Sequence, residues 1–407
     1  MTVPEAPGDA RVRGEECRIN ALPDELLLHA ISYLDVRELV QTCVLSRRWR
    51  DLWRSVTRIH ASWEEFDGEA DTPQECALLF KRFVERMLML RNPTELAEFS
   101  LSYHIPAWDC LDLDQLNVES KDANLWIGHA LQSNVRSLKV DVCGDRLLLD
   151  QLVFPPTCFL TNLELSSVIL FPGFFENLQT GCTVLERLIL EDCDINDVEI
   201  SSQTLKVLSI GQLCAFIFQE QACISIPSLC YLGFFAYLET LPSLKNMESL
   251  VMADVSVGHT RTQVDEMRQF LKGLSGVTHL YFNYEEVMLE MERNLELCPR
   301  FDNLTVLTLG DWWLDLDFCA FTDFLQNSPY LVKLTLKVNE KILRFIGELK
   351  EVLYTCEHLE TLEIVCLGGD SVANSLEKLL LESGMTFGLI EVKRLNGNPS
   401  LVVAPRV

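Results

Sequence analysis

The stretch LERLILEDCDI, residues 185–195, holds the pattern that decides the fold of this chain of 407 residues. Its apolar residues Leu185, Leu188 and Leu190 are separated by two variable residues and then by one. The same spacing recurs along the chain, and the middle residues of ten successive repeats are Leu138, Leu163, Leu188, Leu208, Leu232, Leu250, Leu280, Leu307, Leu334 and Leu362. The intervals between them range from 18 (232 to 250) to 30 (250 to 280), mostly within the period of leucine-rich repeats.

Each repeat predicts a short strand whose leucines point inward, followed by a helix or an irregular return segment. Because each repeat buries its apolar side only against its neighbours, the array predicts a curved solenoid with a concave parallel sheet over residues 96–367. The uneven spacing indicates insertions on the return side. We assign residues 368–407 to a C-terminal cap, and the polar residues 1–18 to a flexible leader.

A different, helical pattern occupies residues 19–63. One helix is expected after Leu22 and Pro23, a second after Asp35, and a third, short one after Ser46. A unit of this size cannot bury all of its large apolar residues internally, so we expect it to need a partner surface. Residues 64–95 are expected to form an acidic linker and a helix that runs from about Pro73 to Leu90.

The composition excludes several classes of function. The chain has 60 acidic and 34 basic residues, a formal charge of −26, which argues against binding of nucleic acids or anionic membranes. No apolar run is long enough to cross a bilayer. The 15 cysteines include no CxxC pair, so we expect free thiols in a reducing compartment and no metal site. Common catalytic and nucleotide-binding motifs are absent, so we expect no catalytic residues, no enzymatic activity and no cofactor.

The segment CRINALPDELLLHAISYLDVRELVQTCVLSRRWRDLW, residues 17–53, strongly resembles the F-box of plant F-box proteins. Together with the repeats that follow it, the chain resembles the F-box/LRR-repeat family. The resemblance implies an α/β protein in which a three-helix F-box precedes an irregular leucine-rich-repeat solenoid. It also implies that the F-box docks on a Skp-class linker, that the linker joins it to the cullin and RING subunits of a ubiquitin ligase, and that the repeats capture a protein substrate for degradation. The expected location is the nucleus or the cytoplasm.

The resemblance also implies which residues contact the linker. They are the apolar residues of the F-box motif: Leu22, Pro23, Leu26, Ile31, Leu34, Val40, Val44, Leu45, Trp49, Leu52 and Trp53. An alternative is that most of them only hold the three helices together, and both roles can coexist in so small a unit.

The substrate is expected on the concave face, which the variable residues beside the inward leucines should line. We expect an apolar and aromatic centre flanked by basic residues, and the candidates are Arg187, Ile189, Tyr231, Phe235, Val251, Tyr281, Lys333 and Lys337. The charged residues at the predicted concave positions sum to zero, which places the excess of acid on the leader, the linker and the return side. Two alternatives stay open: a receptor for a small hormone-like ligand, and a scaffold that acts without a ligase.

Overall fold

The structure is a computed structural model, which describes residues 18–105, 113–149, 154, 158–217, 221–237, 240–258, 264–284, 298–310, 319–339, 358–367 and 389–394. The chain divides into two compact units, Met1–Phe99 and Ser100–Val407. The expected leader, apart from residue 18, and most of the expected C-terminal cap lie outside the described residues.

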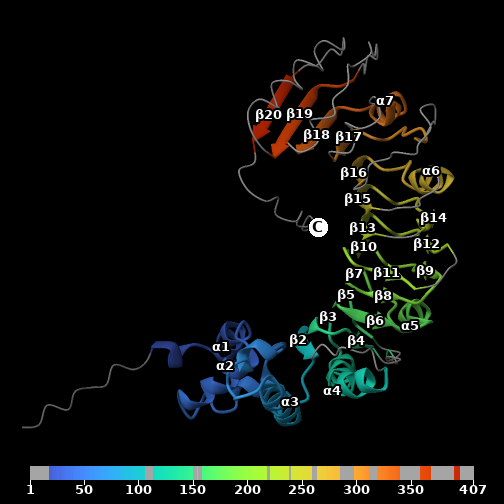
Figure 1. Cartoon of the computed structure of the whole chain (residues 1–407). Helices are drawn as coiled ribbons and strands as arrows, with labels where there is room; N and C mark the ends of the chain where they lie inside the picture. Colours follow the sequence, from blue (N-terminus) through green and yellow to red (C-terminus); the bar gives the residue numbers. More distant parts are fainter. Residues whose placement is uncertain are drawn as a thin grey trace, which may run out of the picture. The chain divides into compact units, whose positions relative to one another are not determined.

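The first unit is built from short helices and one long one (Figure 1). Its elements are η1 (Arg18–Ala21), α1 (Asp24–Ile31), α2 (Val36–Gln41), η2 (Thr42–Val44), η3 (Leu52–Ser55), β1 (Arg58–Ser62), η4 (Trp63–Phe66) and α3 (Pro73–Leu90). The first two expected helices are present. The third is not an α-helix, because the segment after Ser46 forms turns and a single 3-10 turn. Tertiary contacts made by Arg48 and Trp49 hold this segment instead.

Helix α3 has the bounds that the sequence predicts. Thr72 precedes it, and its hydroxyl oxygen accepts a hydrogen bond from the backbone amide of Glu75 at 3.2 Å. Pro73 occupies the first turn, where the missing amide hydrogen has no partner to lose. The buried side of the helix includes Phe80 and Val84, so capping and apolar spacing together explain why it forms.

The second unit is a solenoid of parallel strands, stacked in the order in which they occur in the chain (Figure 1). From β2 onward, the long sheet has the order β2 (Glu98–Ile105), β3 (Ser137–Gly144), β5 (Asn162–Ser166), β7 (Arg187–Glu191), β10 (Val207–Ile210), β13 (Tyr231–Tyr237), β15 (Met252–Gly258), β16 (His279–Tyr284), β17 (Val306–Leu309), β18 (Lys333–Asn339), β19 (Thr361–Leu367) and β20 (Leu389–Arg394). This architecture confirms the α/β repeat fold that the leucine spacing predicts.

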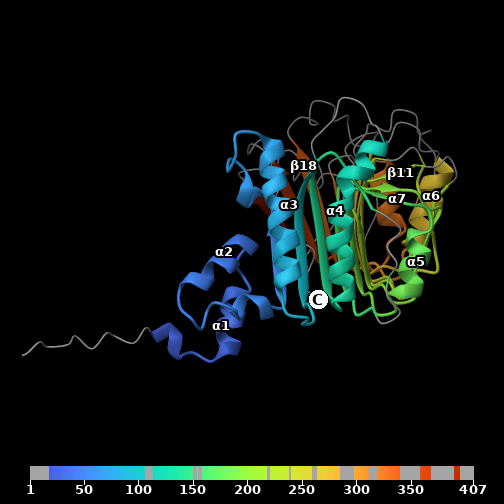
Figure 2. The ribbon, with the colours of Figure 1, turned by 90° about the horizontal axis from the view of Figure 1, so that it is seen from below.

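The return side of the coils carries helices and two smaller sheets, and Figures 1 and 2 show α5, α6 and α7 on the side away from the long sheet. One small sheet has the order β11-β8-β6-β4 and the other β14-β12-β9. Their strands are β4 (Leu147–Leu148), β6 (Val168–Leu170), β8 (Asp194–Ile195), β9 (Glu199–Ser201), β11 (Ala215–Phe216), β12 (Cys223–Ser225) and β14 (Ser243–Lys245), and the helices are α4 (Leu113–Gln132), α5 (Phe174–Gly181), α6 (Val264–Gly273) and α7 (Cys319–Gln326). This mixture accounts for the uneven repeat length.

The core is a ladder of leucines in register from strand to strand. Leu188, for example, is paired with Leu163 on one side and Leu208 on the other, and all three are buried. Nine of the ten predicted middle residues lie on this ladder: Leu138, Leu163, Leu188, Leu208, Leu232, Leu280, Leu307, Leu334 and Leu362. Burial of each leucine stabilises the fold by about 1.5–3 kcal/mol.

The tenth middle residue, Leu250, was placed wrongly. Ala253, not Leu250, pairs with Leu232 and with Leu280, and Val255 is the next inward residue. Leu250 is instead the buried first residue of its triad. The error arose because alanine at the middle position is a weaker apolar signal than the flanking Met252, which points outward.

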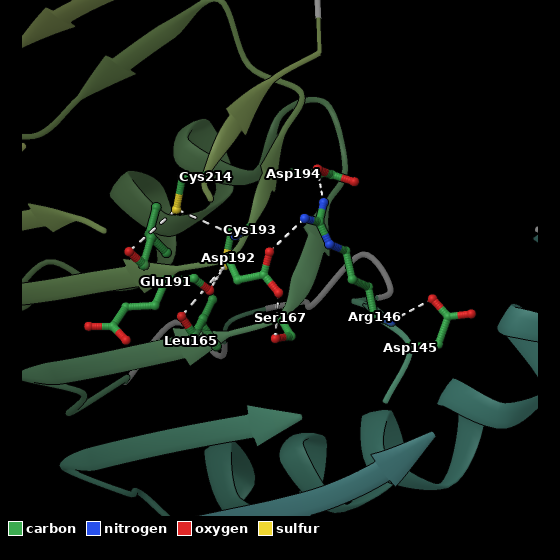
Figure 3. A network of polar contacts seen from close by, with 10 residues as sticks. Asp145, Arg146, Leu165, Ser167, Glu191, Asp192, Cys193, Asp194 and Cys214 are labelled. Atoms are coloured by element: carbon green, nitrogen blue, oxygen red, sulfur yellow. Dashed lines mark hydrogen bonds and ion pairs between the residues drawn. The ribbon is translucent and has the colours of Figure 1, made fainter. Parts of the chain in front are cut away.

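A polar network joins the turns that follow the strands β3, β5 and β7 (Figure 3). The Arg146 guanidinium donates to the carboxylate of Asp192 at 2.6 Å and also to that of Asp194. Ser167 donates its hydroxyl to Asp192 at 2.9 Å. Both Ser167 and Asp192 have positive φ, 57° and 51°. The network therefore fixes left-handed turns on successive coils.

Candidate functional site

The first unit separates its apolar residues into a core and an exposed set. The core contains three of the residues predicted to contact a linker, Ile31, Trp49 and Trp53. Trp49 is 2% exposed, and its indole N–H donates to the side-chain oxygen of Asn20 at 2.8 Å. In this structure these three side chains are buried within the unit, and their contact with a linker stays a prediction.

The exposed set is unusually apolar for a protein surface. Val44 is 82% exposed, Leu45 61% and Leu26 53%. Leu22 and Pro23 are exposed as well. We call these five residues, Leu22, Pro23, Leu26, Val44 and Leu45, the F-box apolar surface. Exposed aliphatic side chains in a group of this kind mark a site where another surface binds.

Arg48 links the two segments that carry the F-box apolar surface. Its guanidinium donates to the backbone carbonyl of Leu22 at 2.6 Å and to the Asp24 carboxylate. It also donates to the carbonyl oxygen of Asn20. The chain just after Leu45 is thereby held against the start of α1.

The other predicted residues of this unit, Leu34, Val40 and Leu52, are half-buried. Two exposed large apolar side chains within residues 19–63 were missed: Ile19, which is 45% exposed, and Tyr33, at 60%. The Tyr33 ring lies edge-on to His29 and under the Arg58 guanidinium, 5.3 Å from it. Tyr33 follows the helical run, and no spacing in the sequence singles it out.

The second unit places seven of the eight predicted substrate-binding residues on outward positions of its long sheet. Arg187, Ile189, Tyr231, Phe235, Tyr281, Lys333 and Lys337 all alternate with inward residues of their strands. Val251 is the exception. It is exposed but precedes β15, whose outward positions are Met252, Asp254 and Ser256. The prediction for Val251 failed because of the register error at Leu250.

The corrected register brings Asp254 into the middle of this face. The Tyr231 hydroxyl donates to the Asp254 carboxylate at 2.9 Å. On the far side of Asp254 is Tyr281, its neighbour across the strand pair β15–β16, and the Lys337 ammonium lies 4.2 Å from the centre of the Tyr281 ring. We call Tyr231, Asp254, Tyr281 and Lys337 the central cluster.

Burial changes the acidity of the groups in the central cluster. It raises the pKa of Asp254, although the Tyr231 hydroxyl and the positive charge of Lys337 oppose the rise. It lowers the pKa of Lys337, against the attraction of Asp254. Burial, together with the negative charge of Asp254, also raises the pKa of Tyr231. The cluster is therefore a desolvated polar centre, where electrostatic contacts are stronger than at an open surface.

Ion pairs flank the central cluster. On one side Arg187 lies 3.9 Å from Glu164, and on the other Lys333 lies 2.7 Å from the buried Glu363. With Asp254 included and the misplaced positions removed, the outward residues of the ten repeats carry four basic and five acidic side chains, a net charge of −1.

The described part of the chain contains neither a candidate metal site nor a candidate membrane span. No group of three or more histidine, cysteine or acidic residues there could hold a metal ion. Among the same residues, no helix is long and apolar enough to cross a membrane.

Comparison with known protein families gives a match to the F-box domain over residues 19–60. A putative FBD-associated F-box protein of Arabidopsis thaliana is 29% identical over 425 residues, covering 94% of this chain and 98% of its own length. The chain contains a match to the F-box domain and is similar over most of its length to plant F-box/LRR-repeat proteins. Two further Arabidopsis relatives agree: an F-box/LRR-repeat protein, 26% identical over 77% of this chain and 72% of its own, and an F-box/FBD/LRR-repeat protein, 26% identical over 84% of both.

The similarity to plant F-box/LRR-repeat proteins gives the two units a general interpretation. The family match supports a substrate-adaptor role, with the F-box in the first unit and the repeats in the second. The matched residues 19–60 contain the whole F-box apolar surface.

Proposed function

We propose that this chain is the substrate-recognition subunit of a Skp–cullin–F-box ubiquitin ligase. The observation that carries the proposal is the F-box apolar surface, five exposed apolar residues within the segment that matches the F-box domain. Leaving such side chains in water gives up the free energy that their burial would contribute, about 25 cal/mol per Å². A Skp-class linker would supply the apolar surface that covers them.

The mechanism that we propose is proximity. The F-box fixes the chain to the linker, the linker fixes it to the cullin and RING subunits, and the concave face of the repeats holds a protein substrate. Transfer of ubiquitin then behaves as an intramolecular reaction, because the substrate is held at a high effective concentration. The chain makes and breaks no bond itself, and the ubiquitinated substrate passes to the proteasome.

Co-purification with the linker tests this proposal. Leu22 and Pro23 are both exposed, so the double variant Leu22→Ala, Pro23→Ala removes apolar contact area without opening the core. We expect the tagged full-length variant to lose the Skp-class linker in a pull-down from plant cells, while its thermal unfolding stays unchanged. The matched control is Met89→Ala, which removes a side chain that is 74% exposed on α3 of the same unit. Linker recovery equal to that of the control would contradict the proposal.

Proximity labelling tests whether the repeats hold a protein substrate that is degraded through the F-box. We expect proteins labelled by the wild-type chain under proteasome inhibition to become more abundant when the double variant replaces it. Labelled proteins whose abundance does not depend on the F-box would indicate a scaffold that acts without a ligase.

A further inference from the structure

Charges near the centre of the concave face are unequally compensated. The Arg187 and Lys333 side chains each have a carboxylate as neighbour, at 3.9 Å and 2.7 Å. The Lys337 ammonium has the face of the Tyr281 ring. Within the described residues, the Asp254 carboxylate has one hydrogen-bond partner, the neutral hydroxyl of Tyr231, and no cation within ion-pair distance. Of the three carboxylates compared, those of Glu164, Glu363 and Asp254, that of Asp254 is therefore the least well paired.

The incomplete pairing of the Asp254 carboxylate costs free energy, because the side chain is partly removed from water. A carboxylate offers about four acceptor positions, and the Tyr231 hydroxyl fills one of them. Asp254 is half-buried, so water replaces the missing partners only in part, and burial raises its pKa. A partner that supplies a positive charge with N–H donors would remove this cost, whereas a second carboxylate would add to it.

Aromatic rings beside Asp254 suit the same kind of partner. Tyr231 and Tyr281 occupy the strands on either side of β15, and Phe235 lies further along β13. The position of Lys337, 4.2 Å from the ring centre of Tyr281, shows that a cation is accommodated on this surface. An arginine or lysine side chain from outside would meet the Asp254 carboxylate beside these rings, next to the face of Tyr281 that Lys337 covers.

Two small residues lie in the same row of the sheet as Asp254. Gly233 lies directly beside Asp254 in the register of β13 and β15, and Ser209 is the next residue along the same row. A Cβ atom at Gly233 would lie 2.9 Å from the Ser209 hydroxyl oxygen and 3.3 Å from the Phe235 ring, so these two side chains pack closely over Gly233. Long-range attraction acts in the same direction, because a net charge of −26 steers basic partners toward the chain.

We propose that the concave face recognises a basic segment of its protein substrate, and that Asp254 pairs with one arginine or lysine side chain of that segment. This inference rests on the proposed function, since it names the chemistry of the substrate that the repeats hold. The guanidinium or ammonium donates to the carboxylate oxygen that Tyr231 leaves free, and the rings of Tyr231 and Tyr281 flank it.

Selection from a library of short random peptides displayed on phage, with the full-length chain as bait, tests the inference. We expect the selected peptides to share an arginine or lysine. Replacing this residue in a synthetic peptide by citrulline, which keeps the shape of arginine without its charge, should weaken binding roughly tenfold or more. The Asp254→Asn variant should weaken binding of the basic peptide by a similar factor, while it leaves binding of the citrulline peptide unchanged.

The control for net charge is Glu248→Gln, which removes an exposed carboxylate from the same unit. It should bind the basic peptide as the wild type does. The asparagine at position 254 can still accept the Tyr231 hydrogen bond, and equal thermal unfolding of the two variants shows that a loss of binding is not a loss of fold.

Several results would overturn the inference: no enriched peptide, enrichment of peptides without a basic residue, or equal binding to wild type and Asp254→Asn. Selection of acidic peptides whose binding depends on Lys337 would show that the substrate segment is acidic and not basic. These outcomes are independent of linker binding. If these results are obtained while the linker still co-purifies, they contradict only the proposal that the substrate segment is basic. A failure of the adaptor proposal would instead appear as unchanged linker recovery in the pull-down with the double variant.

Discussion

Glu65 is the residue whose protonation links the fold of the first unit to pH. Its carboxylate accepts hydrogen bonds from the backbone amide of Arg37, at 3.2 and 3.3 Å. Burial raises its pKa from 4.5 to about 7, the negative charges of Asp35 and Glu38 add to the rise, and the backbone hydrogen bonds oppose it. The folded state thus binds a proton that the unfolded state has already released between these pH values.

The free energy of unfolding should therefore fall as the pH rises from 4.5 through about 7. The full shift corresponds to ~3 kcal/mol, and solvent screening of this half-buried group reduces the expected change to about 1 kcal/mol. Glu65→Gln keeps an acceptor for the Arg37 amide but cannot ionise, so it should flatten this dependence. Thermal unfolding on both sides of the window measures it, with the exposed neighbour Glu64→Gln as control. An unchanged pH dependence in Glu65→Gln would assign the effect to another group.

The position and contacts of Asp254 could not be predicted from the sequence. Its strand was predicted, but the three-residue error in register put Val251 where Asp254 belongs. Tyr231, Tyr281 and Lys337 were predicted individually because the leucine spacing marks outward positions. Their gathering around one carboxylate depends on neighbouring strands and on the reach of a lysine side chain, neither of which a local pattern contains.

At the scale of elements, the long helix α3 and most of the repeat strands were predicted correctly from the regular apolar spacing of the local sequence. The helix expected from about Pro73 to Leu90 has these bounds in α3, and Thr72 caps its first turn. The segment after Ser46 also has helical spacing, in Trp49 and Trp53, but it forms turns because its side chains serve distant contacts. The repeats were recognised because ten nearly equal triads support one another, and only the triad with alanine at its centre was misplaced.

The turns between elements depend on Arg146, which neutralises Asp192 and Asp194 (Figure 3). Arg146→Ala would leave two neighbouring carboxylates without their cation, and we expect a loss of about 1–2 kcal/mol in the free energy of unfolding. Lysine at this position should restore part of it, since one ammonium cannot donate in the geometry of a guanidinium. Urea unfolding of the full chain measures the change.

Arg300→Ala is the matched control for the turn network. Arg300 also pairs with an aspartate, Asp302, but both side chains are largely exposed, so solvent screens the pair and we expect no measurable change. Equal effects of the two substitutions would show that the Arg146 network does not stabilise the coils.

At the scale of the whole molecule, each unit carries one face with an incomplete set of contacts. In the first unit it is the F-box apolar surface, and in the second it is the central cluster with Asp254. The total charge of −26 first indicated only what the chain does not bind. With the corrected register the concave face is close to neutral, so the excess of acid lies elsewhere in the chain, where it favours solubility and attracts basic partners.

The affinity of the purified full-length chain for a purified Skp-class linker tests the central claim most directly. Leu26 and Leu45 are 53% and 61% exposed, so the double variant Leu26→Ala, Leu45→Ala should unfold at the same temperature as the wild type. By titration calorimetry we predict that it binds the linker roughly a hundredfold more weakly, as expected when two buried anchors of an interface are truncated. Met89→Ala should bind like the wild type. Equal dissociation constants for the wild type and the double variant would contradict the account.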